Sequence, residues 1–179
     1  AKAVRESPEM SAEHWGYIFE GCKSLLQLTI TGGEPFVRDD VKEIIESIIR
    51  SSGVPRVSIR TNGYYKDRIK EDVVYLLEKF PQTDFTLCIS LDGPEEIHDR
   101  VREFEGGYAK ALETIDELVE SRDKNGNFIL RLDSVLTDDN REYMEDFLAK
   151  TESWPIDYHG IILVRDVPSK VQEGLRDLY

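Results

Sequence analysis

One octet, Thr29-Ile30-Thr31-Gly32-Gly33-Glu34-Pro35-Phe36, has the residue types to hold a ligand. Gly32 and Gly33 lack a Cβ atom, so the backbone there can adopt positive φ and approach a bound group closely. Pro35 removes one donor and fixes the direction in which the chain leaves. The carboxylate of Glu34 can accept two hydrogen bonds from an ammonium or amide group. The octet predicts a binding loop, and the alternative is a tight turn that carries an acid by chance.

The octet lies between a predicted strand over residues 25–31 and a predicted helix over residues 41–51. Leucine and isoleucine dominate the strand, and apolar residues recur at helical spacing in the helix, which Asp39 or Asp40 can cap. In sheets of alternating strands and helices, ligands bind where strands end and helices begin. We therefore place the octet at the carboxyl edge of a sheet.

Three further predicted strands carry short polar groups at or near their downstream ends. These are Thr61-Asn62-Gly63, then Ser90-Leu91-Asp92-Gly93, then Arg131 with Asp133. Such donors and acceptors suit a ligand with an ammonium, a carboxylate and ribose hydroxyls. Asn62 or Asp92 could each simply cap a turn. Four such groups in one chain favour a shared site.

The rest of the chain supplies the elements that must position these groups. Predicted strands cover 25–31, 56–62, 85–91, 128–136 and 158–164; predicted helices cover 11–22, 41–51, 69–80, 111–119, 143–148 and 171–178. A polar loop that contains Gly106-Gly107 precedes the fourth helix, and Cys22 falls on the apolar stripe of the first as a small core residue. Strands that alternate with helices predict an α/β fold with a parallel sheet and right-handed crossovers. We expect residues 1–179 to form a single domain.

The strands alternate in polarity, which a parallel strand covered on both faces would not do. Phe85, Leu87, Ile89 and Leu91 alternate with Thr86, Cys88, Ser90 and Asp92, and the other strands behave similarly. Because buried unpaired charges cost several kcal/mol, the polar face must hold water, a ligand or a charge network. A curved sheet with a polar concave side fits this best, and the alternative is a flat sheet with one solvated face. In the last strand the pattern assigns Ile162 to the helix-covered face and His159 to the polar face, with His159 as a packed or bridging residue.

The composition excludes several classes of partner. The chain of 179 residues is 40% hydrophobic and 33% charged, with a net charge of −13. This acidity disfavours nucleic acid and anionic membranes, and no apolar run approaches the roughly 20 residues of a membrane span. The two cysteines, Cys22 and Cys88, fall on different elements, which indicates neither a disulfide framework nor a local metal motif. We expect a cytoplasmic protein.

Together these motifs resemble radical S-adenosylmethionine (radical SAM) enzymes of the peptide-maturase, haem-d1 and cofactor-assembly type. The resemblance rests on the octet, Thr61-Asn62-Gly63, Ser90-Leu91-Asp92-Gly93-Pro94, Ile97-His98-Asp99, Arg102 and Gly106-Gly107-Tyr108. It implies a partial (β/α)6 TIM-like barrel, of which five units run over residues 11–165. Residues 32–36 also resemble the loop of diguanylate cyclases, but that loop lies on a β-hairpin and needs a second acid where Pro35 stands.

The resemblance also implies roles for the motif residues. The segment from Gly32 to Pro35, including Gly33 and Glu34, would meet the methionyl amino group of S-adenosylmethionine. Thr61, Asn62 and Ser90 would contact its methionyl part or ribose, Asp92 a ribose hydroxyl, and Arg131 a carboxylate. The same resemblance gives His98, Asp99 and Arg102 the role of holding their loop. No catalytic residue is assigned.

The chain departs from the family in its cysteines. The family's Cys-x3-Cys-x2-Cys motif, which holds a 4Fe–4S cluster, is absent, and Cys22 and Cys88 cannot replace it. We expect a piece of a longer protein that is truncated at its N-terminus, so that the first βα unit is missing or incomplete, and also truncated at its C-terminus. The cluster ligands would then lie outside this chain, with no metal site within it. The parent would cleave S-adenosylmethionine reductively to a 5′-deoxyadenosyl radical that takes hydrogen from a substrate, and this chain alone would be inactive.

The same resemblance implies a small-molecule or peptide substrate and an electron donor such as a flavodoxin or ferredoxin. Two alternatives stay open. One is a cluster-less, non-catalytic module of the same fold that binds a nucleoside or peptide. The other is a different α/β-barrel enzyme with a lysine or metal site, although no lysine stands at a predicted strand end.

Overall fold

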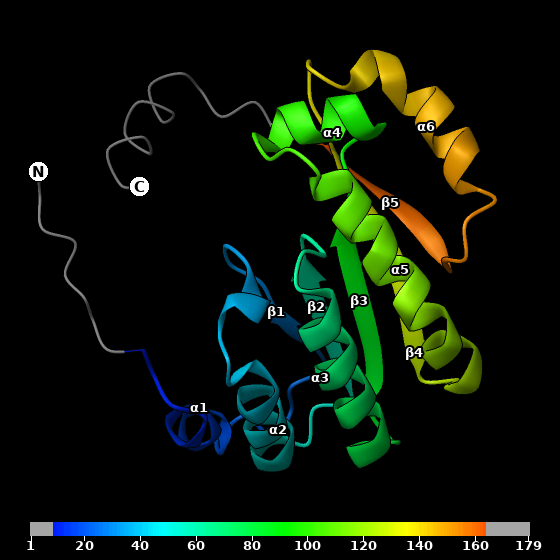
Figure 1. Cartoon of the computed structure of the whole chain (residues 1–179). Helices are drawn as coiled ribbons and strands as arrows, with labels where there is room; N and C mark the ends of the chain where they lie inside the picture. The colour runs from blue at the N-terminus through cyan, green and yellow to red at the C-terminus, as the bar shows by residue number, and fades with distance from the viewer. Residues whose placement is uncertain (1–8, 164–179) are drawn as a thin grey trace, which may run out of the picture.

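The computed structural model describes residues 9–163, which form one parallel five-stranded sheet with helices between the strands (Figure 1). The strand order is β1-β2-β3-β4-β5, so each strand pairs with its neighbours in sequence. The elements are α1 (Ala12–Phe19), β1 (Leu28–Ile30), α2 (Val41–Ser52), β2 (Arg56–Thr61), α3 (Lys66–Lys79), β3 (Asp84–Ser90), α4 (Glu95–Arg102), α5 (Gly107–Lys124), β4 (Phe128–Leu136), α6 (Met144–Thr151) and β5 (Tyr158–Leu163), with 3₁₀ turns at Pro35–Val37 and Arg141–Tyr143. The predicted α/β class and parallel sheet are confirmed.

Hydrophobic side chains on alternate strand positions form the core under the helices. The buried residues of the three central strands include Val57, Ile59, Phe85, Leu87, Ile89, Phe128, Leu130 and Leu132. Helices α3 and α5 lie together on this face of the sheet (Figure 1). The other face carries Ser58, Arg60, Thr86, Cys88, Arg131 and Asp133, which share register positions across β2, β3 and β4. The predicted polarity of the two faces is therefore correct for the central strands.

Several elements differ in extent from the prediction, and one helix was not predicted. The first strand is shorter than predicted, and the polar loop before Gly106 contains helix α4. The sequence hides α4 because its buried residues are only Ile97 and His98. Its charges mark it instead, since acids occupy the first turn and arginines the last, which suits the helix dipole. The predicted helix over 171–178 lies outside the described residues.

Two side chains do not have the role that the sequence pattern predicts. Cys22 is exposed, because α1 ends at Phe19 and does not extend the apolar stripe to it. Asp40 precedes α2 but makes no capping bond, since its carboxylate pairs with Arg38.

The last strand has the opposite phase to the predicted one. His159 stands in register with Leu132 and therefore faces the helices, whereas Ile162 stands beside Val135 on the other face. His159 bridges Ser134 Oγ at 2.7 Å and Thr151 Oγ1 at 2.9 Å, which confirms its predicted bridging role.

No helix among residues 9–163 has the length and apolar character that crossing a membrane requires.

Truncation of a core leucine should destabilise the protein far more than truncation of an exposed one. Leu130 is completely buried, whereas Leu26 is 70% exposed. Leu130→Ala should lower the free energy of unfolding by about 2–5 kcal/mol because it removes buried methyl groups and leaves a cavity. Leu26→Ala should change it by about 0.5 kcal/mol or less. Urea denaturation of both variants measures the difference, and equal losses would contradict the assigned core.

The stability that the contact between α2 and α3 contributes should decrease as the pH falls. Burial raises the pKa of Glu46, but hydrogen bonds from Tyr75, Arg50 and Lys79 outweigh it and lower the pKa to about 2. A carboxylate with a lowered pKa stabilises the fold above its unfolded pKa of about 4.3, and the gain disappears as the pH falls towards the folded value. Glu46→Gln should therefore reduce stability at pH 7, with a deficit that shrinks from pH 4.5 to pH 2.5. Urea titrations at several pH values test this, and a deficit independent of pH would contradict it.

Candidate functional site

The carboxylate of Glu34 joins the first loop to the end of β2. Its Oε1 accepts hydrogen bonds from the backbone of Phe36 at 3.1 Å and from Thr61 Oγ1 at 2.9 Å. Its Oε2 accepts from the backbone N–H of Asn62 at 2.7 Å. Both oxygens are therefore used within the protein, and the side chain fixes the loop against its neighbour.

The glycines of the same loop leave its backbone uncovered. Gly32 has a φ of 151°, a conformation that favours glycine, and a Cβ added at Gly32 or Gly33 would meet nothing within 4 Å. Both residues are exposed. The peptide groups of the loop are thus open to a ligand, while the hydrogen bonds of Glu34 hold the loop against the end of β2.

The ends of β2 and β3 lie along the same edge as this loop. Thr61 is buried, and its Oγ1 both donates to Glu34 and accepts from the backbone N–H of Gly63 at 3.0 Å. Asn62 is exposed and accepts from the backbone of Tyr64 at 3.0 Å through its Oδ1. Ser90 is half-buried at the last position of β3. Asn62 and Ser90 therefore present side chains at this edge, whereas Thr61 supports Glu34.

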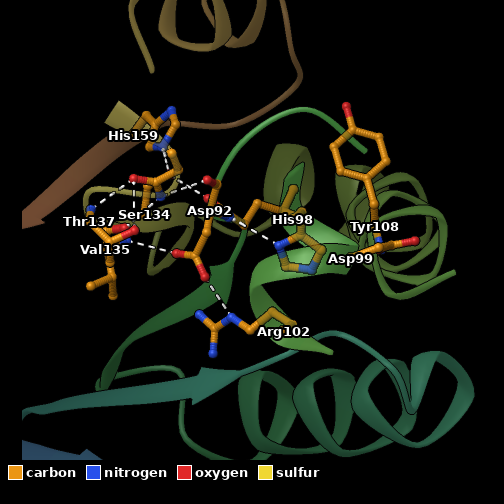
Figure 2. Close-up of polar contacts among 11 residues, drawn as sticks. Asp92, His98, Asp99, Arg102, Tyr108, Ser134, Val135, Thr137 and His159 are labelled. Carbon is orange, nitrogen blue, oxygen red and sulfur yellow. Dashed lines mark hydrogen bonds and ion pairs between the residues drawn. The ribbon is translucent and has the colours of Figure 1, made fainter. Parts of the chain in front are cut away.

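Asp92 joins three elements just beyond β3 (Figure 2). Its Oδ2 accepts from Arg102 Nε at 2.6 Å, and its Oδ1 accepts from the backbone N–H of Val135 at 2.8 Å. Its own N–H donates to His98 Nδ1 at 3.1 Å, and its carbonyl accepts from Asn140 Nδ2 at 2.8 Å. The residue is 2% exposed. Both carboxylate oxygens are engaged, so this arrangement ties β3, α4 and β4 together and leaves no oxygen directed at the open edge.

The residues that follow Asp92 hold their loop, as the sequence predicted. Asp99 accepts from the backbone N–H groups of Gly106 at 2.6 Å and Tyr108 at 2.9 Å, which fixes the start of α5. Burial lowers the pKa of His98, against a smaller opposing effect of Asp92. A neutral ring is what its role as hydrogen-bond acceptor requires.

Asn140 is a structural residue that the sequence analysis did not single out. It is fully buried, and its importance is evident only from the two carbonyl groups, of Asp92 and Val135, to which its Nδ2 donates.

A third carboxylate, Asp133, lies on the polar face of the sheet opposite the helices, which we call the inner face. It pairs with two arginines there. Its Oδ2 accepts from Arg60 Nη1 at 2.6 Å, and its Oδ1 accepts from Arg131 Nε. The sequence singled out Arg131 and Asp133 but gave Arg60 no role, because Arg60 is distant in sequence. Its place on the polar side of an alternating strand was the only signal. The polar face thus holds a charge network, one of the contents predicted for it.

The described residues do not fit an iron–sulfur cluster. Among residues 9–163, no three His, Cys, Asp or Glu side chains are grouped as metal ligands would be. Cys22 is exposed, whereas Cys88 is buried within the sheet, and burial raises the pKa of its thiol. The chain contains no third cysteine.

The Radical SAM superfamily model matches residues 3–150, most of the chain. This protein belongs to the radical SAM superfamily. Enzymes of this superfamily use S-adenosylmethionine and a 4Fe–4S cluster. The family prediction made from the loop motifs is therefore confirmed.

Two curated proteins are similar in sequence to this chain. The chain is 28% identical over 115 residues to the sporulation killing factor maturation protein SkfB of Bacillus subtilis (strain 168), covering 63% of this chain and 26% of SkfB. It is 30% identical over 139 residues to the GTP 3′,8-cyclase of Alkaliphilus oremlandii (strain OhILAs), covering 77% of this chain and 40% of the cyclase. The chain thus spans less than half the length of these relatives.

Solved structures support the fold. Native anSMEcpe with bound AdoMet aligns with a TM-score of 0.64 and 16% identity, over 87% of this chain and 42% of that one. The complex of anSMEcpe with AdoMet and the Kp18Cys peptide gives the same values. At this identity the likeness concerns the fold, and it confirms the TIM-like barrel architecture predicted for the sheet.

Removing the cation beside Asp92 should destabilise the radical SAM core. Arg102→Gln leaves a buried carboxylate without its charged partner, and we expect a loss on the order of 2 kcal/mol, since Arg102 itself is partly exposed. Arg100→Gln is the matched control on the same helix, because within residues 9–163 Arg100 donates to a backbone carbonyl, that of Asp139 at 3.3 Å, and not to a carboxylate. Thermal or urea denaturation compares them. If both variants lost the same stability, the pairing with Asp92 would not be the cause.

Proposed function

We propose that this chain is the core domain of a radical SAM oxidoreductase and binds S-adenosylmethionine at the carboxyl edge of the sheet. The observation that carries the proposal is the loop held by Glu34, which presents the open backbone of Gly32 and Gly33 beside Asn62 and Ser90. In the whole protein, the bound S-adenosylmethionine would be cleaved reductively to methionine and a 5′-deoxyadenosyl radical that takes hydrogen from a substrate.

The chain's own residues would bind and orient the cofactor. Peptide groups of Gly32 and Gly33 would meet the methionyl ammonium, with Pro35 directing the chain away from it. The amide of Asn62 and the hydroxyl of Ser90 would contact the methionyl part or the ribose. Because Glu34 already accepts three hydrogen bonds, its role in this proposal is to hold the loop.

Three further residues predicted to bind the cofactor lie behind or below the carboxyl edge. Thr61 would act through Glu34, to which it donates. Asp92 would position the end of β3 and the start of α4, because its carboxylate is buried and fully engaged. Arg131, which the family resemblance assigns to a carboxylate of the cofactor, lies deeper on the inner face than Ser90 does.

The remaining parts of the proposal concern partners. SkfB is named as a maturation protein, and two anSMEcpe structures contain a peptide. A small-molecule or peptide substrate would therefore suit this protein, with an electron donor such as a flavodoxin or ferredoxin. We also propose that residues 1–179 form one domain and that the protein is cytoplasmic.

Cofactor binding can be tested by filling the space above the loop. Gly33 does not have positive φ and has no neighbour where a side chain would lie, so Gly33→Val should fold normally. If the cofactor touches this backbone, the added side chain should weaken S-adenosylmethionine binding at least tenfold by calorimetry. Gly21→Val is the matched control, because Gly21 is also exposed with open space around it. Undiminished binding by the Gly33 variant, or no binding by the unsubstituted chain, would refute the proposed site.

A cluster-less binding module of the same fold is the second candidate, and it needs no cysteines beyond the two that this chain contains. The full-length protein separates the two. It would be loaded anaerobically with iron and sulfide, then reduced with S-adenosylmethionine present, and 5′-deoxyadenosine would be measured. The oxidoreductase predicts this product. A loaded cluster without product would reject it, whereas S-adenosylmethionine binding without any cluster would support the module.

A further inference from the structure

Two arginines from different strands converge on one buried carboxylate in the middle of the inner face. Arg60 on β2 and Arg131 on β4 both donate to Asp133, one to each carboxylate oxygen. The side chain of Asp133 is 3% exposed, whereas those of Arg60 and Arg131 are 37% and 25% exposed. The two guanidinium groups therefore cover the carboxylate and remain partly exposed themselves.

The neighbouring strand fixes the position of Arg131. Its guanidinium carbon lies 4.9 Å from the ring centroid of Tyr158, and its Nη1 lies 3.5 Å from the Tyr158 hydroxyl. Gly160 leaves the room that this arrangement needs, because a Cβ there would overlap the Arg131 guanidinium and lie 2.6 Å from Asp133 Oδ1. A side chain at position 160 would therefore displace the Arg131 guanidinium from this arrangement.

The cluster carries more positive charge than its carboxylate needs. Asp133 contributes one negative charge and the arginines two positive charges, which leaves one in excess in a chain whose net charge is −13. One arginine would neutralise the charge of Asp133, and the second satisfies the other carboxylate oxygen while adding a further positive charge. Each guanidinium uses one donor group on Asp133, so N–H groups remain on both.

The cluster lies between the carboxyl edge and a polar cavity. Arg131 stands two positions before Asp133, which pairs with Ser90, so it lies roughly 7 Å deeper along the strand direction. Below it is a cavity of about 440 Å³, whose lining includes Arg131, Tyr158, Ser58 and Thr86. A molecule on the inner face could place an anionic group against the arginines without occupying the Gly32–Gly33 loop.

We propose that Arg60 and Arg131 form an oxyanion site for a phosphate or carboxylate group of the substrate, with Asp133, Tyr158 and Gly160 as positioning residues. Two guanidinium groups held at fixed angles can each donate to one oxyanion, which is the geometry that makes arginine effective for these groups. The substrate assignment rests on the proposed function, whereas the oxyanion site itself does not. The carboxylate of S-adenosylmethionine has the same chemistry and is the competing source.

The test uses inorganic pyrophosphate as the probe and the full chain as the protein. Calorimetry should show saturable binding to one site, and Arg60→Gln and Arg131→Gln should each weaken it at least tenfold. Gly160→Ala should weaken it as well, because the added methyl group displaces Arg131. Arg122→Gln is the matched control, since Arg122 is 21% exposed and also pairs with a single acid, Asp123, but lies on α5. This variant should bind pyrophosphate as the unsubstituted chain does.

The outcomes separate the alternatives. Unchanged binding by the Arg60 and Arg131 variants, or an equal loss in the Arg122 variant, overturns the site, provided that circular dichroism shows native folding. Arg60→Lys and Arg131→Lys keep the charge and serve as second variants if the glutamine forms do not fold. They should still weaken binding, because a lysine ammonium lacks the planar, forked set of N–H donors of a guanidinium. Displacement of pyrophosphate by S-adenosylmethionine assigns the site to the cofactor and overturns its use for the substrate. Pyrophosphate binding in a chain that does not bind S-adenosylmethionine rejects the proposed function and retains the site.

Discussion

Carboxylates that are satisfied inside the protein determine the geometry of the carboxyl edge. Parallel strands bring their ends to one edge, but the loops that leave those ends have no regular hydrogen bonding of their own. Asp92 supplies these hydrogen bonds at the ends of β3 and β4, because both of its carboxylate oxygens and its backbone N–H and C=O groups are engaged. The cost of burying a charge is tolerable only with this number of partners, so any shift of one partner disturbs the others.

Glu34 plays the equivalent part between β1 and β2. An acid that looks ready to bind a ligand instead binds Phe36, Thr61 and Asn62, and the ligand-facing groups are backbone atoms of the glycines before it. This division of labour gives a rigid loop with an uncovered peptide surface. Such preorganisation lowers the entropy cost of binding, because the loop does not have to order when the ligand arrives.

The inner face shows how a half-open barrel can keep charge within its sheet. The arginines around Asp133 are close enough to neutralise it, yet both of their side chains remain partly exposed. The excess of positive charge there contrasts with the acidity of the whole chain. A local field of this kind favours anions on the inner face even though the protein as a whole repels them.

The sequence alone determined the order and type of most elements and the faces of the central strands. Hydrophobic periodicity depends on local spacing, which is why β4 was predicted over its full length while α4, with few buried residues, was missed. The sequence also located the loop motifs, because glycine and proline have backbone requirements that do not depend on distant residues.

Only the tertiary structure decided what each polar side chain does. Asp92 and Glu34 have many acceptor positions and could serve a ligand or the protein, and the choice depends on donors such as Arg102, Val135 and Thr61 brought in from other strands and helices. The convergence of Arg60 with Arg131 and the phase of β5 likewise depend on strand register. Register is set by packing across the whole sheet, which no local pattern in the sequence contains.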